Sequence, residues 1–442
     1  MKKHLILTEV VKKVRKDSFY LSNSSYDYNK GPLSNNRILF KDVFIKKSFS
    51  AEYVYLKEVN EKLLNFLQDY LNNKFGLKNN KDYWRIILFI WLTRYTSHNY
   101  NKWMMINKLK KKRVIKYVVE DLYNDLDTKI NKDYIHYKSK LDCPFYNFFI
   151  TKRIINYCKL KNVIFLKNDN ILKKKKLIIP KSKFSFKNFY IEYVDSIISK
   201  IAFRYNSILF DAFLYPSKYF IKLCFGLNLI PVINKNMFVD KDQVDLQLYN
   251  LKDRTNKLFK SNKKKNNDRF FDYIKNHILI DLPMSYFENY KNMRAKIIEK
   301  AKSRKTILSM HSLLLHDLFR IYTAETKKIG SKLIVVDHGG QMHKYRAIFD
   351  YLNIISDESI QWCKRGKSKS PVKRLAPTKF KPDFEIQCTS DKNCTIVSSE
   401  NNKFNYMSHS IAGLEDDIKT FEDVLILAKS LKSNIKKKLR LR

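Results

Sequence analysis

Apolar side chains recur with a helical period in several long segments of the chain. In the segment 52–75 the spacing of Tyr55, Leu63 and Leu67 is typical of one side of an amphipathic helix. The segment 83–105 is apolar around most of its circumference, which predicts a helix buried at the centre of the fold. The same period predicts further helices at 217–227, 268–279, 286–302, 317–328 and 415–429.

Short uninterrupted apolar runs lie between these helices and predict strands that are covered on both faces, as in a parallel sheet. These runs are 5–8, 162–166, 207–211, 306–309, 331–336 and 395–399. The runs 306–309 and 331–336 flank the helix 317–328, and Gly330 suits the left-handed position that ends a helix. Strand, helix and strand in this order predict a right-handed βαβ unit and an α/β fold.

The strand 331–336 ends on a turn that contains the candidate chemistry, Asp337-His338-Gly339-Gly340. Ligands of open α/β sheets bind beyond the carboxyl ends of the strands, and paired glycines let backbone N–H groups approach an anionic ligand. We predict that His338 is a general base or a hydrogen-bond donor to substrate, with Gly339 and Gly340 as backbone contacts. The alternative is a histidine that bonds to its own backbone in a tight turn.

The charge of the chain is strongly positive. Its 87 Lys and Arg residues exceed its 43 Asp and Glu residues by 44, which would attract nucleic acid, anionic lipid or phosphorylated substrates. However, the lysines are spread along the chain, and no nucleic-acid motif with aromatic residues at fixed spacing accompanies them. We therefore predict no specific nucleic-acid surface. Binding of DNA or RNA through charge alone is an alternative hypothesis.

The six cysteines have no CxxC spacing and no associated histidine cluster, so we predict free thiols and no metal site. The longest apolar run, 86–92, is far shorter than the roughly 18 residues that span a bilayer. The N-terminal stretch from Met1 to Glu9 meets a charge too early, at Glu9, to be a signal peptide. These features predict a cytoplasmic protein.

Four segments resemble, in the same order, the surface-carbohydrate (O-antigen and related polysaccharide) transferases of bacteria. The segments are Tyr83-Trp84-Arg85-Ile86 with Trp91-Leu92, Leu282-Pro283 with Tyr286-Phe287-Glu288-Asn289-Tyr290, His338-Gly339-Gly340, and Ile355-Ser356-Asp357 with Trp362. The chain departs from that family where Gln341-Met342-His343 follows the glycines, at Tyr351-Leu352, and at Cys363.

The resemblance implies the two-Rossmann-domain architecture of GT-B glycosyltransferases. Residues 1–385 would form the acceptor-side domain with helical insertions, and residues 386–442 would form only the start of the donor-side domain. The implied substrates are a nucleotide-activated sugar and a saccharide acceptor, without a cofactor. Because most of the donor domain would be missing, we expect a truncated member whose catalytic activity is in question.

Three further residues are candidate substrate contacts. Asp357 can orient a ligand hydroxyl or cap a helix, and Glu288 can face the cleft or pair with Lys291 or Arg294 on a helix surface. His311 follows the strand 306–309, whose carboxyl end should face the same crevice as His338. His316 should lie near that crevice too.

A different class of function fits the same residues. The positively charged chain suits a non-catalytic module that binds a lipid-linked saccharide or the anionic inner face of the membrane. In that case the protein would contact the membrane peripherally and would not transfer sugar.

Overall fold

The computed structural model of the chain describes residues 2–9, 18–26, 37–40, 49–111, 115–121, 130–167, 207–210, 225–226, 230–233, 244–256, 267–298, 306–309, 311–337, 347–361, 371–374, 394–396 and 414–441. Strands and helices alternate along it, and all the strand pairs in these ranges are parallel, as an α/β chain requires. The predicted mixed α/β fold with parallel sheets is therefore confirmed, and it is consistent with a Rossmann-like arrangement.

The larger sheet has six strands. In spatial order these are β10 (Val372–Arg374), β9 (Glu358–Gln361), β8 (Lys332–Val336), β7 (Thr306–Ser309), β5 (Ser207–Phe210) and β6 (Ile230–Ile233). The chain proceeds outward from β5 to β6, and then outward on the other side from β7 to β10. The strand order therefore reverses between β5 and β7, and this is where open α/β sheets bind ligands.

A second parallel sheet is formed by the N-terminal part of the chain. Its strands, in spatial order, are β2 (Phe19–Tyr20), β1 (Lys2–Ile6), β3 (Lys116–Asp121) and β4 (Val163–Lys167), with the 3₁₀ turn η1 (Asn23–Ser25) after β2. The expected domain 1–385 thus holds two parallel sheets. The boundary at 385 stays a prediction, since it lies outside the described residues.

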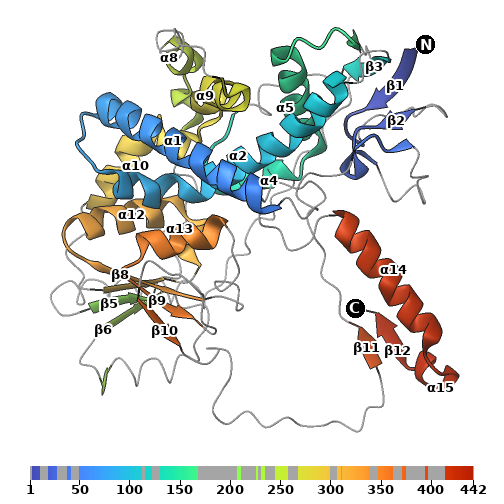
Figure 1. Cartoon of the computed structure of the whole chain (residues 1–442). Helices are drawn as coiled ribbons and strands as arrows, with labels where there is room; N and C mark the ends of the chain where they lie inside the picture. The colour runs from blue at the N-terminus through green and yellow to red at the C-terminus, as the bar shows by residue number, and fades with distance from the viewer. Residues whose placement is uncertain are drawn as a thin grey trace.

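Helix α2 (Lys81–Lys111) is the central element of the fold. Helix α1 (Phe49–Phe75) packs on one side of it, and α12 (Asp317–Lys328) and α13 (Ala347–Ile355) separate it from the six-stranded sheet (Figure 1). Trp84 and Trp91 are fully buried, and Arg85 forms an ion pair with Glu61, so the predicted core role of this segment is confirmed.

The sequence makes Asp82 a plausible N-cap of the helix 83–105, and the structure corrects this prediction. Asp82 lies inside the helix and pairs with Arg85. The carboxamide of Asn80 is the cap, because its Oδ1 accepts a hydrogen bond of 2.9 Å from the backbone N–H of Tyr83. Asn and Asp serve equally well as caps, so the local pattern did not separate them.

The remaining helices surround this core or follow it in sequence. They are α4 (Tyr134–Leu141), α5 (Pro144–Tyr157), η5 (Leu246–Leu248), α8 (Leu251–Asn256), α9 (Arg269–Asp281), η6 (Met284–Tyr286), α10 (Tyr290–Ile298) and α11 (Ser312–Leu315). A C-terminal unit follows with β11 (Cys394–Ile396), α14 (Leu414–Ser430), α15 (Ser433–Lys436) and β12 (Leu439–Leu441), and Figure 1 shows it to one side of the six-stranded sheet.

The predicted βαβ unit is confirmed almost residue for residue. Strand β7, helix α12 and strand β8 follow each other, and β7 pairs with β8 in parallel. Gly330 has a φ of +95°, and Ser331 donates a backbone hydrogen bond to the carbonyl of Thr326, which closes the helix end. A side chain at position 330 would be strained in this conformation.

Two of the predicted helices, 286–302 and 217–227, are not confirmed. The single helix 286–302 is wrong, because η6 and α10 are separated where Glu288 and Asn289 bond to the segment 244–256. The helix 217–227 falls almost entirely outside the described residues. Among the described residues, no helix is both long enough and apolar enough to cross a membrane.

Candidate functional site

The carboxyl edge of the six-stranded sheet collects polar side chains from neighbouring strands. Ser309 is the last residue of β7, His311 follows it, Asp337 follows β8, and Gln361 ends β9. We call Ser309, His311, Asp337 and Gln361 the carboxyl-edge cluster. It begins at the reversal between β5 and β7, so the topology alone indicates a ligand site here.

Three members of the carboxyl-edge cluster are fully buried, namely Ser309, Asp337 and Gln361. The Ser309 hydroxyl has no hydrogen-bond partner among the described residues. The Gln361 Nε2 donates hydrogen bonds to Ser359 at 3.0 Å and to Asn353 at 3.2 Å, which fixes its amide. The Gln361 Oε1 also has no partner among the described residues. A buried polar atom without a partner is costly, so the Ser309 hydroxyl and the Gln361 Oε1 are the atoms in this cluster that most need a ligand or a bridging group.

A buried acid and a buried arginine lie directly behind the cluster. Asp317 begins α12 and forms an ion pair with Arg320 one turn later, and neither side chain is exposed. The Arg320 Nη1 also donates a hydrogen bond of 2.8 Å to the carbonyl oxygen of Leu313. This bond holds α11 and thereby the turn after His311. The arginine therefore ties the end of β7 to the start of α12.

Asp317 also collects donors from two other parts of the chain. Its Oδ1 accepts from the Tyr286 hydroxyl at 2.9 Å, and its Oδ2 accepts from the Ser285 hydroxyl at 2.5 Å and from the Tyr134 backbone N–H at 3.1 Å. These donors belong to η6 and to the start of α4. Asp317 thus fixes η6 and the start of α4 against the N-terminus of α12.

The charge of Asp317 affects a neighbouring carboxyl group. Burial, and secondly the Asp317 charge, raise the pKa of Asp133 to about 6, although its bonds to the backbone N–H groups of His136 and Ile135 act in the opposite direction. Asp133 is the N-cap of α4, because its Oδ1 accepts a hydrogen bond of 2.7 Å from the backbone N–H of His136. Two carboxyl groups thus share one partly buried region beside the cluster.

The structure brings together some of the predicted site residues. His311 and the end of β8 lie at adjacent strand ends, because Ser309 pairs with Val335. His316 lies at the other end of α11, directly before α12. The predicted residues His338, Gly339 and Gly340 lie outside the described residues, although Asp337 directly before them is described.

Asp357 is not part of this cluster. It precedes β9 and therefore lies at the amino edge of the sheet, about 15 Å from the carboxyl edge for a strand of this length. Its Oδ2 accepts a hydrogen bond of 2.7 Å from the Leu333 backbone N–H. The same oxygen forms an ion pair with the Lys327 Nζ at 2.6 Å. The helix-cap alternative is wrong, because the carboxylate caps the start of β8.

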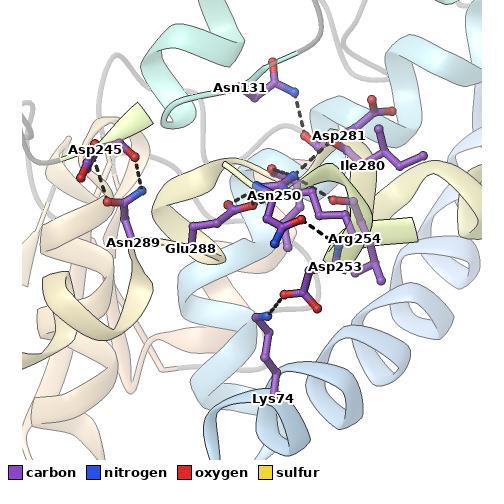
Figure 2. Close-up of polar contacts among 12 residues, drawn as sticks. Lys74, Asn131, Asp245, Asn250, Asp253, Arg254, Ile280, Asp281, Glu288 and Asn289 are labelled. Atoms are coloured by element: carbon purple, nitrogen blue, oxygen red, sulfur yellow. Dashed lines mark hydrogen bonds and ion pairs between the residues drawn. The ribbon is translucent and has the colours of Figure 1, made fainter. Parts of the chain in front are cut away.

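Glu288 lies in another buried network, which Figure 2 shows. Its carboxylate pairs with Arg254, at 2.7 Å from Nε to Oε1 and 2.5 Å from Nη2 to Oε2. The predicted surface pairing with Lys291 or Arg294 is wrong, since Glu288 is buried and Arg294 pairs with Glu325 instead. Only the tertiary structure brings residue 254 to residue 288.

Sequence reasoning missed the residues that hold the cluster. Asp317 was predicted as the first residue of a helix, which is confirmed, but the sequence did not show that η6 and α4 would converge on it. An Asp and an Arg three residues apart at a helix start are a common surface pair. Ser309 and Gln361 are ordinary strand-end residues until the strand order is known.

No group of three or more His, Cys, Asp or Glu residues in the described ranges is arranged to hold a metal ion. The cluster offers hydroxyl, imidazole and amide groups, which can donate hydrogen bonds to hydroxyl or phosphate groups, and a carboxylate, which can accept from a hydroxyl group. The buried Asp317–Arg320 pair holds α11, which follows His311. The arrangement can therefore bind and orient a polar substrate at the sheet edge.

Comparison with known proteins gives one match. A family model described as LIC12162 family transferase matches residues 16–442. No curated protein and no solved structure matches the chain.

Proposed function

Because the chain belongs to the LIC12162 family of transferases, we propose that it transfers a sugar from a nucleotide-activated donor, with the carboxyl-edge cluster as its substrate site. The observation that supports this site most strongly is the fully buried Ser309 hydroxyl, without a partner among the described residues, at the strand-order reversal. A transferase must orient two substrates, and a fixed polar edge of a parallel sheet suits that task.

The proposed reaction breaks the bond between the anomeric carbon and the nucleotide's terminal phosphate oxygen. A bond forms between that carbon and an acceptor hydroxyl, and the hydroxyl proton moves to a general base. We assign the base to His338, which directly follows Asp337 in the sequence. The backbone N–H groups of Gly339 and Gly340 are the proposed contacts of the leaving phosphate.

The buried Asp317–Arg320 pair is proposed to position the site without contacting substrate. Arg320 holds α11, and α11 fixes the turn from His311 to His316. Removing the pair should therefore loosen His311 and the end of β7 together. This role follows from the contacts of the pair and not from its charge alone.

The finer parts of the proposal rest on the sequence resemblance. Four segments in register support a role in bacterial surface polysaccharide or O-antigen synthesis and a GT-B-like arrangement of domains. A net charge of +44 supports peripheral contact with the anionic inner face of the membrane, where a lipid-linked acceptor would lie. A cytoplasmic location follows from that placement.

The test is thermal-shift measurement of the purified chain against nucleotide sugars and free nucleotides. We expect a shift of several degrees with at least one nucleotide sugar, reduced in Ser309→Ala, His311→Ala and His338→Ala. The control is His136→Ala, the same change on the partly exposed surface of α4. Transfer of labelled sugar to a lipid extract would follow for the donor that gives the shift.

Two results would contradict the proposal. One is a folded chain that responds to none of the nucleotide sugars. The other is a response that survives all three site substitutions, because the donor would then bind elsewhere. Binding of a lipid-linked saccharide without any donor response would favour the non-catalytic binding module.

A further inference from the structure

A separate pocket lies between α1, the end of α2 and the start of α9. Its volume is about 360 Å³, at the lower end of the range for small-molecule sites. The residues that line it are Tyr55, Tyr100, Trp103, Met104, Asn107, Asn267, Asp268, Arg269 and Phe270. The lining residues come from α1, α2 and the start of α9, and none of them belongs to the carboxyl-edge cluster. Helices α12 and α13 lie between α2 and the six-stranded sheet (Figure 1).

Four aromatic rings line the pocket, and the planes of neighbouring rings in this aromatic layer are inclined to each other by 44° to 73°. The ring centroids of Tyr55 and Tyr100 are 5.4 Å apart, those of Tyr100 and Phe270 are 5.1 Å apart, and those of Trp103 and Phe270 are 5.8 Å apart. Tyr100, Trp103 and Phe270 are buried, so the layer is held rigidly. An aromatic ring presents a negative face, which attracts the slightly positive C–H hydrogens of an apolar or saccharide ring.

The rim of the pocket is polar and partly fixed. The Tyr55 hydroxyl lies 2.9 Å from both carboxylate oxygens of Asp268, and Oδ1 of Asp268 also accepts 3.0 Å from the Phe271 backbone N–H. A carboxylate has about four acceptor positions, so Asp268 retains capacity for a ligand hydroxyl. The amides of Asn107 and Asn267 offer donors and acceptors on the same rim.

The charges around the pocket disfavour an anionic ligand. Burial, then Glu52 and Asp268, raise the pKa of Tyr100 to about 12, which reports negative charge near the ring layer. Arg269 lies on the rim but is exposed, so solvent screens its charge. A phosphate in the pocket would meet the Asp268 carboxylate, whereas a neutral ligand with hydroxyl groups would meet no such repulsion.

We propose that this pocket binds a neutral sugar ring of a glycan, with its C–H groups against the Tyr55, Tyr100, Trp103 and Phe270 rings and its hydroxyls on Asp268 and Asn107. Aromatic rings beside carboxylate and amide groups match the apolar and polar groups of a sugar ring. The site would retain a saccharide at a distance from the carboxyl-edge cluster. The inference does not depend on sugar transfer and stands also for a chain that only binds.

The experiment is saturation-transfer NMR of the full chain with methyl glycosides of glucose, galactose, mannose, rhamnose and N-acetylglucosamine at millimolar concentration. Intrinsic tryptophan fluorescence provides a second readout, because Trp103, one of the four tryptophans of the chain, lines the pocket. We expect at least one glycoside to bind, and Asn107→Ala to weaken its binding about five- to tenfold, the usual effect of one lost hydrogen bond. Asn156→Ala, an exposed asparagine on α5, is the matched control and should change nothing.

Tyr55→Phe is a second variant, which keeps the ring and removes only the hydroxyl that holds Asp268. If it lowers stability, Asn107→Ala still tests the proposal, because Asn107 is partly exposed and outside the hydrophobic core. Binding of none of the glycosides, or binding unchanged in Asn107→Ala, would overturn the inference, as would preferential binding of choline or inorganic phosphate. Asn107→Ala should leave any nucleotide-sugar thermal shift intact, which separates this inference from the proposed function.

Discussion

Arg254 and Glu288 form a buried ion pair that connects two segments 34 positions apart, with side chains only 1% and 7% exposed. The same guanidinium donates through Nη1 to the carbonyl oxygens of Leu279, Ile280 and Leu282, at 2.8, 3.1 and 2.6 Å. Arg254 therefore provides hydrogen-bond donors for the last carbonyl oxygens of α9 and also neutralises the charge of Glu288 (Figure 2). Together with the Asn289–Asp245 hydrogen bond and the Lys74–Asp253 ion pair, this side chain holds the segment 244–256 on the helical core.

Glu288→Ala should lower the free energy of unfolding by about 3–5 kcal/mol, because it leaves the Arg254 charge buried without its partner. Chemical denaturation measures the loss. The double variant Arg254→Met with Glu288→Leu should lose less than Glu288→Ala, since no charge remains buried. Asp253→Asn, in a more exposed pair with Lys74, should cost about 0–1 kcal/mol. Equal losses for Glu288→Ala and Asp253→Asn would contradict the buried pair.

Asp317→Asn should destabilise the chain by about 3–5 kcal/mol, because the amide removes the charge that balances the buried Arg320. The turn after β7 should loosen as well, and hydrogen exchange of residues 311–316 should show faster exchange of their amides. Asp69→Asn on the exposed side of α1 is the matched control. Unchanged exchange in 311–316 would mean that the pair does not hold this turn.

His98 should make the fold sensitive to acid. Burial, and secondly the charge of Lys102, lower the pKa of His98 to about 3, below the value of about 6.5 in the unfolded chain. The folded state then binds fewer protons, so this contribution is fully present above pH 6.5 and is lost as the pH falls toward 3. The full loss should be on the order of 5 kcal/mol.

The variant His98→Gln tests this origin of the pH dependence. A glutamine stays neutral and can still donate to Asn147, whose Oδ1 lies 2.9 Å from the His98 ring. Unfolding measured between pH 4 and pH 7 should show a shallower decline for the variant than for the wild type. Identical slopes would show that other groups cause the acid sensitivity.

Gly330→Ala should cost about 1–2 kcal/mol, because φ is +95° and a Cβ atom disfavours that conformation. No atom lies within 4 Å of the position that a Cβ atom would take, so the cost comes from the backbone alone. Gly226→Ala is the control, since that glycine has ordinary φ and equally open surroundings. A neutral Gly330→Ala variant would mean that the end of α12 relaxes at no cost.

The local sequence determined the elements of this protein well. The limits of β7 and α12 follow from apolar runs and periodicity, and the turn between α12 and β8 follows from Gly330. These features depend on interactions between residues near each other in the chain, which a sequence displays directly. The burial of Trp84 and Trp91 follows from the same reasoning, because a helix that is apolar all round must be covered.

The sites depended on the tertiary structure instead. The sequence could not show that Glu288 would meet Arg254, that Asp357 would lie at the opposite sheet edge from His311, or that Asp317 would collect donors from η6 and α4. Nor could it place Tyr55 beside Asp268, which are 213 positions apart. Partners of buried charges are chosen by which helices and strands pack together, and packing is a property of the whole chain. The sequence therefore determined where helices and strands form, and only the fold decided which polar groups share a site.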